Sequence, residues 1–144
     1  VIAGHKAAVE RAGELCKEAG AKRVLPLPVS VPSHCALMSE AAKQLEVELN
    51  NITINTPTID VVNNVDVAVE SSPEAIKAAL VRQLYSPVRW SETIVKISET
   101  GVSKAVEVGP GKVLQGLMKR IDKSISSVSF NDEASLAKTK ELIN

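Results

Sequence analysis

The sequence predicts an α/β protein with a mostly parallel sheet. Segments typical of strands alternate with segments whose apolar residues recur at helical spacing, and this order favours parallel strands joined by helices that cover the sheet faces. The 144 residues include one Trp, one Tyr and one Phe. The core is therefore expected to be packed mainly from Ala, Val, Leu and Ile.

Residues 1–4 predict a strand, and residues 5–19 predict a helix because apolar side chains recur on one face. Residues 22–29 predict a strand, and the two prolines in this segment confine it to a sheet edge or to a strand end, since they cannot donate ladder hydrogen bonds. Ser33 can cap the next helix, which we expect to run to residue 49.

The helix signals are stronger in the second half of the chain. Ser71-Ser72-Pro73-Glu74 has the cap, the proline and the early acid of a helix start, and this helix extends to Tyr85. Ser86-Pro87 begins a second helix, which Gly101 ends. The other predicted elements are strands at 59–62, 104–108 and 125–130 and helices at 112–121 and 133–143.

Charge and composition exclude several classes of function. The 17 basic residues balance the 17 acidic ones, so electrostatics does not favour nucleic acid or an anionic membrane surface as a partner. The sequence has neither an apolar run of about 18 residues nor a signal peptide, so we expect a soluble, cytoplasmic protein. Cys16 and Cys35 lack metal-ligand spacing, so we expect reduced thiols and no metal. Residues 1–4 have the pattern of a strand with no polar residues before it, which suggests that the chain is a fragment.

His34 is the candidate catalytic residue. It follows Val31-Pro32-Ser33, between a predicted strand and an amphipathic helix. Such turns place side chains at the carboxyl edge of a sheet, where catalytic groups gather, and Pro32 stiffens the approach. The alternative is a helix cap or a half-buried polar group without catalytic function.

Three segments together resemble one enzyme family. They are Val31-Pro-Ser-His34, Gln83-Leu-Tyr-Ser-Pro-Val-Arg-Trp90 and Glu107-Val-Gly-Pro-Gly-Lys-Val-Leu114, and in this order they resemble the carboxy-terminal half of malonyl-CoA:acyl-carrier-protein transacylases. The resemblance covers essentially the whole chain. It implies an α/β-hydrolase-like parallel-sheet core with a small ferredoxin-like subdomain. Residues 1–29 would be the second half of that subdomain, and 30–144 the carboxy-terminal part of the core.

The resemblance also implies a function in fatty acid synthesis. Members of the family transfer malonyl from coenzyme A to a serine and then to the phosphopantetheine thiol of acyl carrier protein, by ping-pong chemistry. The coenzyme A thioester is a substrate, and no cofactor is implied. His34 matches the general base and acid. Gln83 matches the residue whose main-chain carbonyl orients that histidine; the alternative for Gln83 is a solvent-facing helix residue.

Ser33, Asn63 and Asn64 are candidate supporting residues. Many relatives carry an aromatic residue where this chain has Ser33, in a stretch that helps to set the choice of acyl group. Asn63-Asn64 ends a predicted strand, where asparagines form turns or orient a neighbouring loop.

The family's nucleophile motif, Gly-x-Ser-x-Gly, is absent from these residues. The family's carboxylate-binding arginine and oxyanion-hole glutamine are likewise expected upstream of Val1. The implied partners are therefore malonyl-CoA, acyl carrier protein and the missing amino-terminal half of the enzyme, and the chain is expected to be inactive alone.

Other readings remain open. The chain could be a non-catalytic interaction module, or Cys35 could be a nucleophile with His34 as its base. Gly109-Pro110-Gly111 could cradle a phosphate at a helix start, but it lacks the spacing of a nucleotide-binding fingerprint, so a tight turn is favoured.

Overall fold

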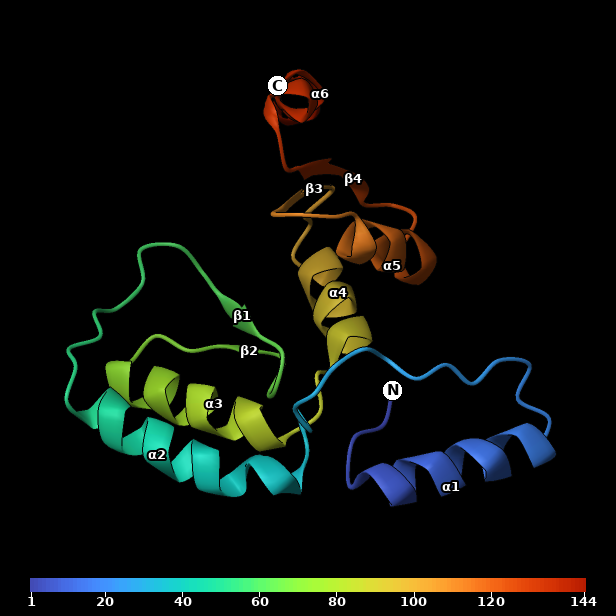
Figure 1. Cartoon of the computed structure of the whole chain (residues 1–144). Helices are drawn as coiled ribbons and strands as arrows, with labels where there is room; N and C mark the ends of the chain where they lie inside the picture. The colour runs from blue at the N-terminus through green and yellow to red at the C-terminus, as the bar shows by residue number, and fades with distance from the viewer. The chain divides into compact units, whose positions relative to one another are not determined.

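The computed structural model describes all 144 residues, which form two compact units, Val1–Val88 and Arg89–Asn144 (Figure 1). The first unit contains α1 (Lys6–Glu18), the 3-10 helix η1 (Ala36–Met38), α2 (Ser39–Asn50), β1 (Val62–Asn63), β2 (Ala68–Val69) and α3 (Pro73–Tyr85). The second contains α4 (Trp90–Glu99), β3 (Lys104–Val108), α5 (Val113–Ile121), β4 (Ser126–Phe130) and α6 (Glu133–Ile143). No helix combines the length and the apolar character needed to cross a bilayer.

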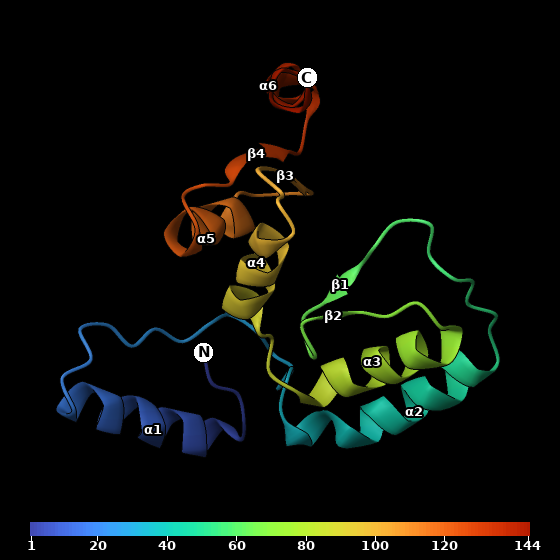
Figure 2. The ribbon, with the colours of Figure 1, turned by 180° about the vertical axis from the view of Figure 1, so that it is seen from behind.

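In the first unit, α2 lies alongside α3, and η1 contacts both helices (Figures 1 and 2). Ala42 and Leu49 of α2 and Ala79 of α3 are buried. Small alanine side chains let helix axes approach closely. The start of α3 follows the sequence signal, because the Ala75 N–H donates to the Ser72 hydroxyl.

The strands of the first unit form a short antiparallel pair. Val62 pairs with Val69, and Asn63 pairs with Ala68. The turn between them contains Val65, which is buried. The pairing closes residues 64–67 into a tight turn between β1 and β2, which comes before α3 in the chain.

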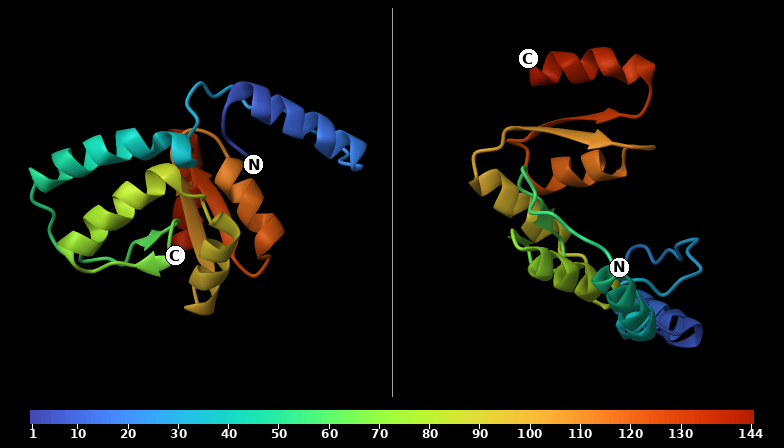
Figure 3. Two further views of the ribbon diagram at one scale, coloured as in Figure 1. Left: turned by 90° about the horizontal axis from the view of Figure 1, so that it is seen from below. Right: turned by 90° about the vertical axis from the view of Figure 1, so that its left-hand side faces the viewer.

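The second unit is built on a parallel pair of strands. β3 and β4 run in register from Lys104 opposite Ser126 to Val108 opposite Phe130. Helix α5 joins them, with α5 on one face of the pair and α6 on the other (Figure 3). This arrangement confirms the predicted α/β class with parallel strands. Ile94, on α4, is 1% exposed and is the largest fully buried side chain.

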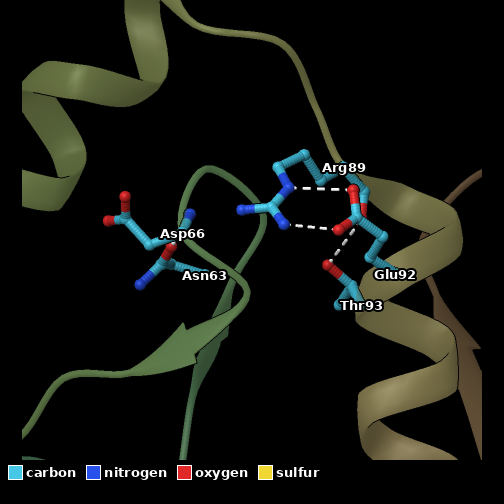
Figure 4. A network of polar contacts seen from close by, with 5 residues as sticks. All are labelled: Asn63, Asp66, Arg89, Glu92 and Thr93. Atoms are coloured by element: carbon cyan, nitrogen blue, oxygen red, sulfur yellow. Dashed lines mark hydrogen bonds and ion pairs between the residues drawn. The ribbon is translucent and has the colours of Figure 1, made fainter.

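A local network fixes the start of α4 (Figure 4). The Arg89 guanidinium donates to both carboxylate oxygens of Glu92, and the Thr93 hydroxyl donates to the Arg89 carbonyl at 3.0 Å. The hydrogen bond from Arg89 lowers the pKa of Glu92 below its usual value. These contacts join residues of the first turn to one another, and none of them is a side-chain cap on a main-chain N–H group.

Several local predictions were wrong. Of the strand predicted at 59–62 only Val62 belongs to a strand, and the helix predicted from Ser86 begins at Trp90. Residues 1–4 and 22–29 are not strands, because no other segment of the structure pairs with them and an unpaired strand has no ladder to stabilise it. Ser33 does not cap a helix: its N–H donates to the Val31 carbonyl, and the helical residues begin at Ala36. The predicted division at residue 30 concerns a larger enzyme and stays a prediction.

Candidate active site

The last turn of α3 holds His34 at two points. The imidazole Nδ1 lies 2.9 Å from the Gln83 carbonyl oxygen, and the His34 main-chain N–H donates to the Leu84 carbonyl at 3.0 Å. The final carbonyls of a helix have no partner within the helix. His34 therefore satisfies two of these carbonyls while they fix its ring and its backbone, and the sequence-predicted pair His34 and Gln83 is brought together.

The contact with Gln83 determines which ring nitrogen is basic. A carbonyl oxygen can only accept a hydrogen bond, so Nδ1 must carry the hydrogen. The lone pair of the neutral ring then lies on Nε2, and the side chain is exposed. The geometry suits a residue that takes up and returns a proton.

The backbone of His34 is in the left-handed region, with φ of 61°. Only one other non-glycine residue, Val67, has a positive φ, of 57°. Such conformations cost about 1–3 kcal/mol and persist only where the surroundings enforce them. The reversal of the chain at His34 also explains why Ser33 lies outside the following helix.

Cys35 makes a different contact from the one that a nucleophile would need. Its thiol donates to the Pro32 carbonyl at 3.2 Å and is half-buried. The imidazole of His34 has its own partner, on α3. The geometry does not support a Cys35–His34 pair.

Asn63 shapes the turn after β1, as the sequence suggested (Figure 4). Its Nδ2 donates to the Ala68 carbonyl at 3.0 Å, and its Oδ1 accepts from the Asp66 N–H at 2.8 Å. Asn64 Oδ1 is buried without a hydrogen-bond partner. Neither asparagine is hydrogen-bonded to His34.

Sequence reasoning missed the ion pair that joins this turn to α3. The Arg82 guanidinium lies 2.5 Å from Asp66 Oδ2, and Arg82 immediately precedes Gln83. The two partners are far apart in the sequence, and neither belongs to a recognisable motif, so only the fold reveals that they meet.

Glu107 occupies the helix start that a phosphate cradle would need. Its carboxylate accepts from the Leu114 N–H at 3.1 Å and from the Gln115 N–H at 2.7 Å. Gly109 and Gly111 both have positive φ, which suits a tight turn between β3 and α5. Because an internal carboxylate already takes these amides, the geometry favours the structural turn.

The fold and the held histidine define the class: an α/β protein that presents one oriented imidazole at a helix end. No model of a known protein family matches the chain. It is 64% identical over 143 residues to the malonyl CoA-acyl carrier protein transacylase of Haemophilus influenzae, and 58% identical over 142 residues to that of Escherichia coli K12. Each match covers 99% of this chain and 46% of the relative.

Solved structures agree. An acyl carrier protein S-malonyltransferase from Vibrio cholerae matches 94% of this chain and 44% of its own, with 61% identity and a TM-score of 0.90. A malonyl-transacylase in complex with a type II PKS acyl-carrier protein matches 96% of this chain and 45% of its own chain, with 59% identity and a TM-score of 0.93. The chain is similar to malonyl CoA-acyl carrier protein transacylases along nearly all of its own length, and it spans about half the length of the curated relatives it matches.

Proposed function

We propose that this chain supplies the general base of an acyltransferase that moves malonyl from coenzyme A to the thiol of acyl carrier protein. The observation that carries the proposal is the contact between His34 Nδ1 and the Gln83 carbonyl, which leaves Nε2 available as the base. The names of the relatives supply the substrate and the acceptor. We further propose a cytoplasmic location.

The proposed first half-reaction uses a serine from outside these 144 residues. His34 Nε2 takes the hydroxyl proton as the serine oxygen attacks the thioester carbonyl. The C–S bond then breaks, the proton passes from His34 to the departing sulfur, and coenzyme A leaves as a thiol. The product is a malonyl ester on the serine, and His34 is neutral again.

The second half-reaction reverses these roles. The thiol of acyl carrier protein gives its proton to Nε2 and attacks the ester carbonyl, the C–O bond breaks, and the serine recovers the proton. Residues 1–29 and 30–144 would then serve a small subdomain and the core of the intact enzyme, and the serine, the carboxylate-binding arginine and an oxyanion-hole donor would come from its amino-terminal half.

The test is acylation of the intact protein that contains this chain. Incubation with malonyl-CoA should add one malonyl group, detected by intact-protein mass spectrometry, and addition of acyl carrier protein should remove it. Acetyl-CoA, which lacks the distal carboxylate, serves as the control and should label far more slowly. An intact protein that takes up no malonyl would favour the non-catalytic interaction module.

A further inference from the structure

We propose that Asp66 and Arg82 are positioning residues for His34, and that their ion pair braces the last turn of α3 through the turn between β1 and β2. The inference rests on the proposed function, because it assigns both residues to the same catalytic base. No hydrogen bond or ion pair joins either side chain to the imidazole, so both would act through the carbonyls that hold it.

The ion pair lies directly beside the residues that hold His34. Arg82 is followed directly by Gln83 and Leu84, the two residues whose carbonyls accept from His34. Displacement of the last turn of α3 would therefore move the partner of Nδ1 and the partner of the His34 backbone together. The Arg82 contact with Asp66 ties this turn to a second part of the first unit.

The turn that presents Asp66 is itself fixed. The side chain of Asn63 accepts from the Asp66 N–H and donates to the Ala68 carbonyl, and the Val67 N–H donates to the Asn63 carbonyl at 3.1 Å (Figure 4). Three hydrogen bonds therefore close a connection of only a few residues. A carboxylate held on such a turn can restrain a helix end, whereas one on a mobile loop could not.

Backbone strain marks both ends of this arrangement. Val67 and His34 are the two non-glycine residues with positive φ. The left-handed region is especially unfavourable for a β-branched residue such as Val67, and strain of this kind gathers where function requires a fixed geometry. One strained residue follows Asp66 directly, and the other is the proposed base.

The ion pair is suited to positioning more than to stability. The Arg82 and Asp66 side chains are 39% and 33% exposed, and pairs this exposed contribute little to the free energy of unfolding. The hydrogen bond to Asp66 raises the pKa of Arg82 above its usual value, so the guanidinium stays charged at any assay pH. Loss of the pair should therefore affect the placement of the ring more than the folded state.

The experiment compares Asp66→Asn, Arg82→Met and Arg82→Lys with the wild type in the intact protein. One readout is the single-turnover rate of acyl-enzyme formation with malonyl-CoA, together with KM. The other is the ¹⁵N NMR signature of the His34 ring, which distinguishes its tautomers and is assigned with His34→Gln. The matched control is Glu40→Gln, which removes the charge from the 2.7 Å pair with Lys43 within α2; neither of these side chains is hydrogen-bonded to His34, Gln83 or Leu84.

We expect Asp66→Asn and Arg82→Met to slow acylation about 10- to 100-fold with little change in KM, since small misplacements of a reacting group have effects of this size. The ring should change from one tautomer to a mixture, Arg82→Lys should retain most of the activity, and Glu40→Gln should match the wild type. Wild-type rates together with an unchanged ring signature in both variants would overturn the proposal. It would also be overturned if the variants unfolded, or if their melting temperature fell while the ring kept its single tautomer. If the wild type forms no acyl-enzyme, the proposed function fails, and the tautomer measurement still decides whether the brace exists.

Discussion

His34 draws its expected reactivity from the main chain of one helix. An acidic partner would add a formal charge beside the imidazole, whereas the Gln83 carbonyl adds a fixed acceptor. The residue identity at 83 should then matter less than the position of its backbone, because every residue type has the same carbonyl.

Gln83 provides a direct test of that reasoning. We expect Gln83→Ala to retain acylation within about tenfold of the wild type, since the carbonyl remains and alanine favours a helix. Gln83→Pro should lose far more, because proline disturbs the backbone of the last turn. Single-turnover acylation of the intact protein checks both. A severe loss in Gln83→Ala, with the backbone unmoved in a crystal structure, would show that the side chain acts instead.

At the scale of single residues, the sequence was informative where a motif existed. The resemblance selected His34 and Gln83, and the structure brings them into contact. Asp66 and Arg82 carry no motif, and their pairing depends on how the turn after β1 meets α3. Sequence patterns indicate local structure, so they did not predict a contact that depends on the tertiary fold.

Elements with strong local signals were predicted well. α3 starts at Pro73 after its Ser72 cap, and β3 spans the predicted residues 104–108. The predicted strand at 22–29 failed because strand formation needs a partner, and apolar alternation alone does not provide one. Its apolar side chains Leu25, Leu27 and Val29 are each at least 60% exposed.

The packing of α4 predicts a stability effect. Ile94 is 1% exposed, so Ile94→Ala leaves a cavity and should lower the free energy of unfolding by about 2–5 kcal/mol. Chemical denaturation of the intact protein measures the loss. As the control, Val95→Ala removes a neighbouring side chain that is 46% exposed and should cost much less. Equal effects of the two substitutions would contradict the assigned core.

The cap of α6 predicts a pH dependence. Hydrogen bonds from Ser135 lower the pKa of Asp132 below its ordinary value of 3.8. Because the folded-state pKa is the lower one, the stabilisation is present above about pH 3.8 and is lost as the pH falls through the folded-state value. Asp132→Asn keeps an acceptor without titrating. The melting temperature of the wild type should therefore fall more steeply in acid than that of Asp132→Asn, and parallel curves would exclude the effect.

At the scale of the whole molecule, the chain matches its relatives along nearly all of its own length and along less than half of theirs. It also carries exposed apolar side chains, including Ile59 and Val61 in the segment before β1. Under the proposed function, we expect a further part of the intact protein to cover these side chains, because exposed apolar surface marks interaction sites.

The 144 residues alone should therefore differ from the intact protein. Without a Gly-x-Ser-x-Gly segment they should take up no label from radiolabelled malonyl-CoA, and they should associate or bind a hydrophobic dye. Full-length protein assayed in parallel provides the control. Stoichiometric, hydroxylamine-labile label on the isolated chain would show that it contains its own nucleophile, with Cys35 the first candidate.

The rate of serine acylation in His34→Ala tests the central claim most directly. In the intact protein, loss of the general base should slow acylation by malonyl-CoA about 10²- to 10⁴-fold. The melting temperature should stay close to that of the wild type, because the exposed ring contributes little packing. A variant that folds normally and acylates as fast as the wild type would contradict the assignment of His34 as the base.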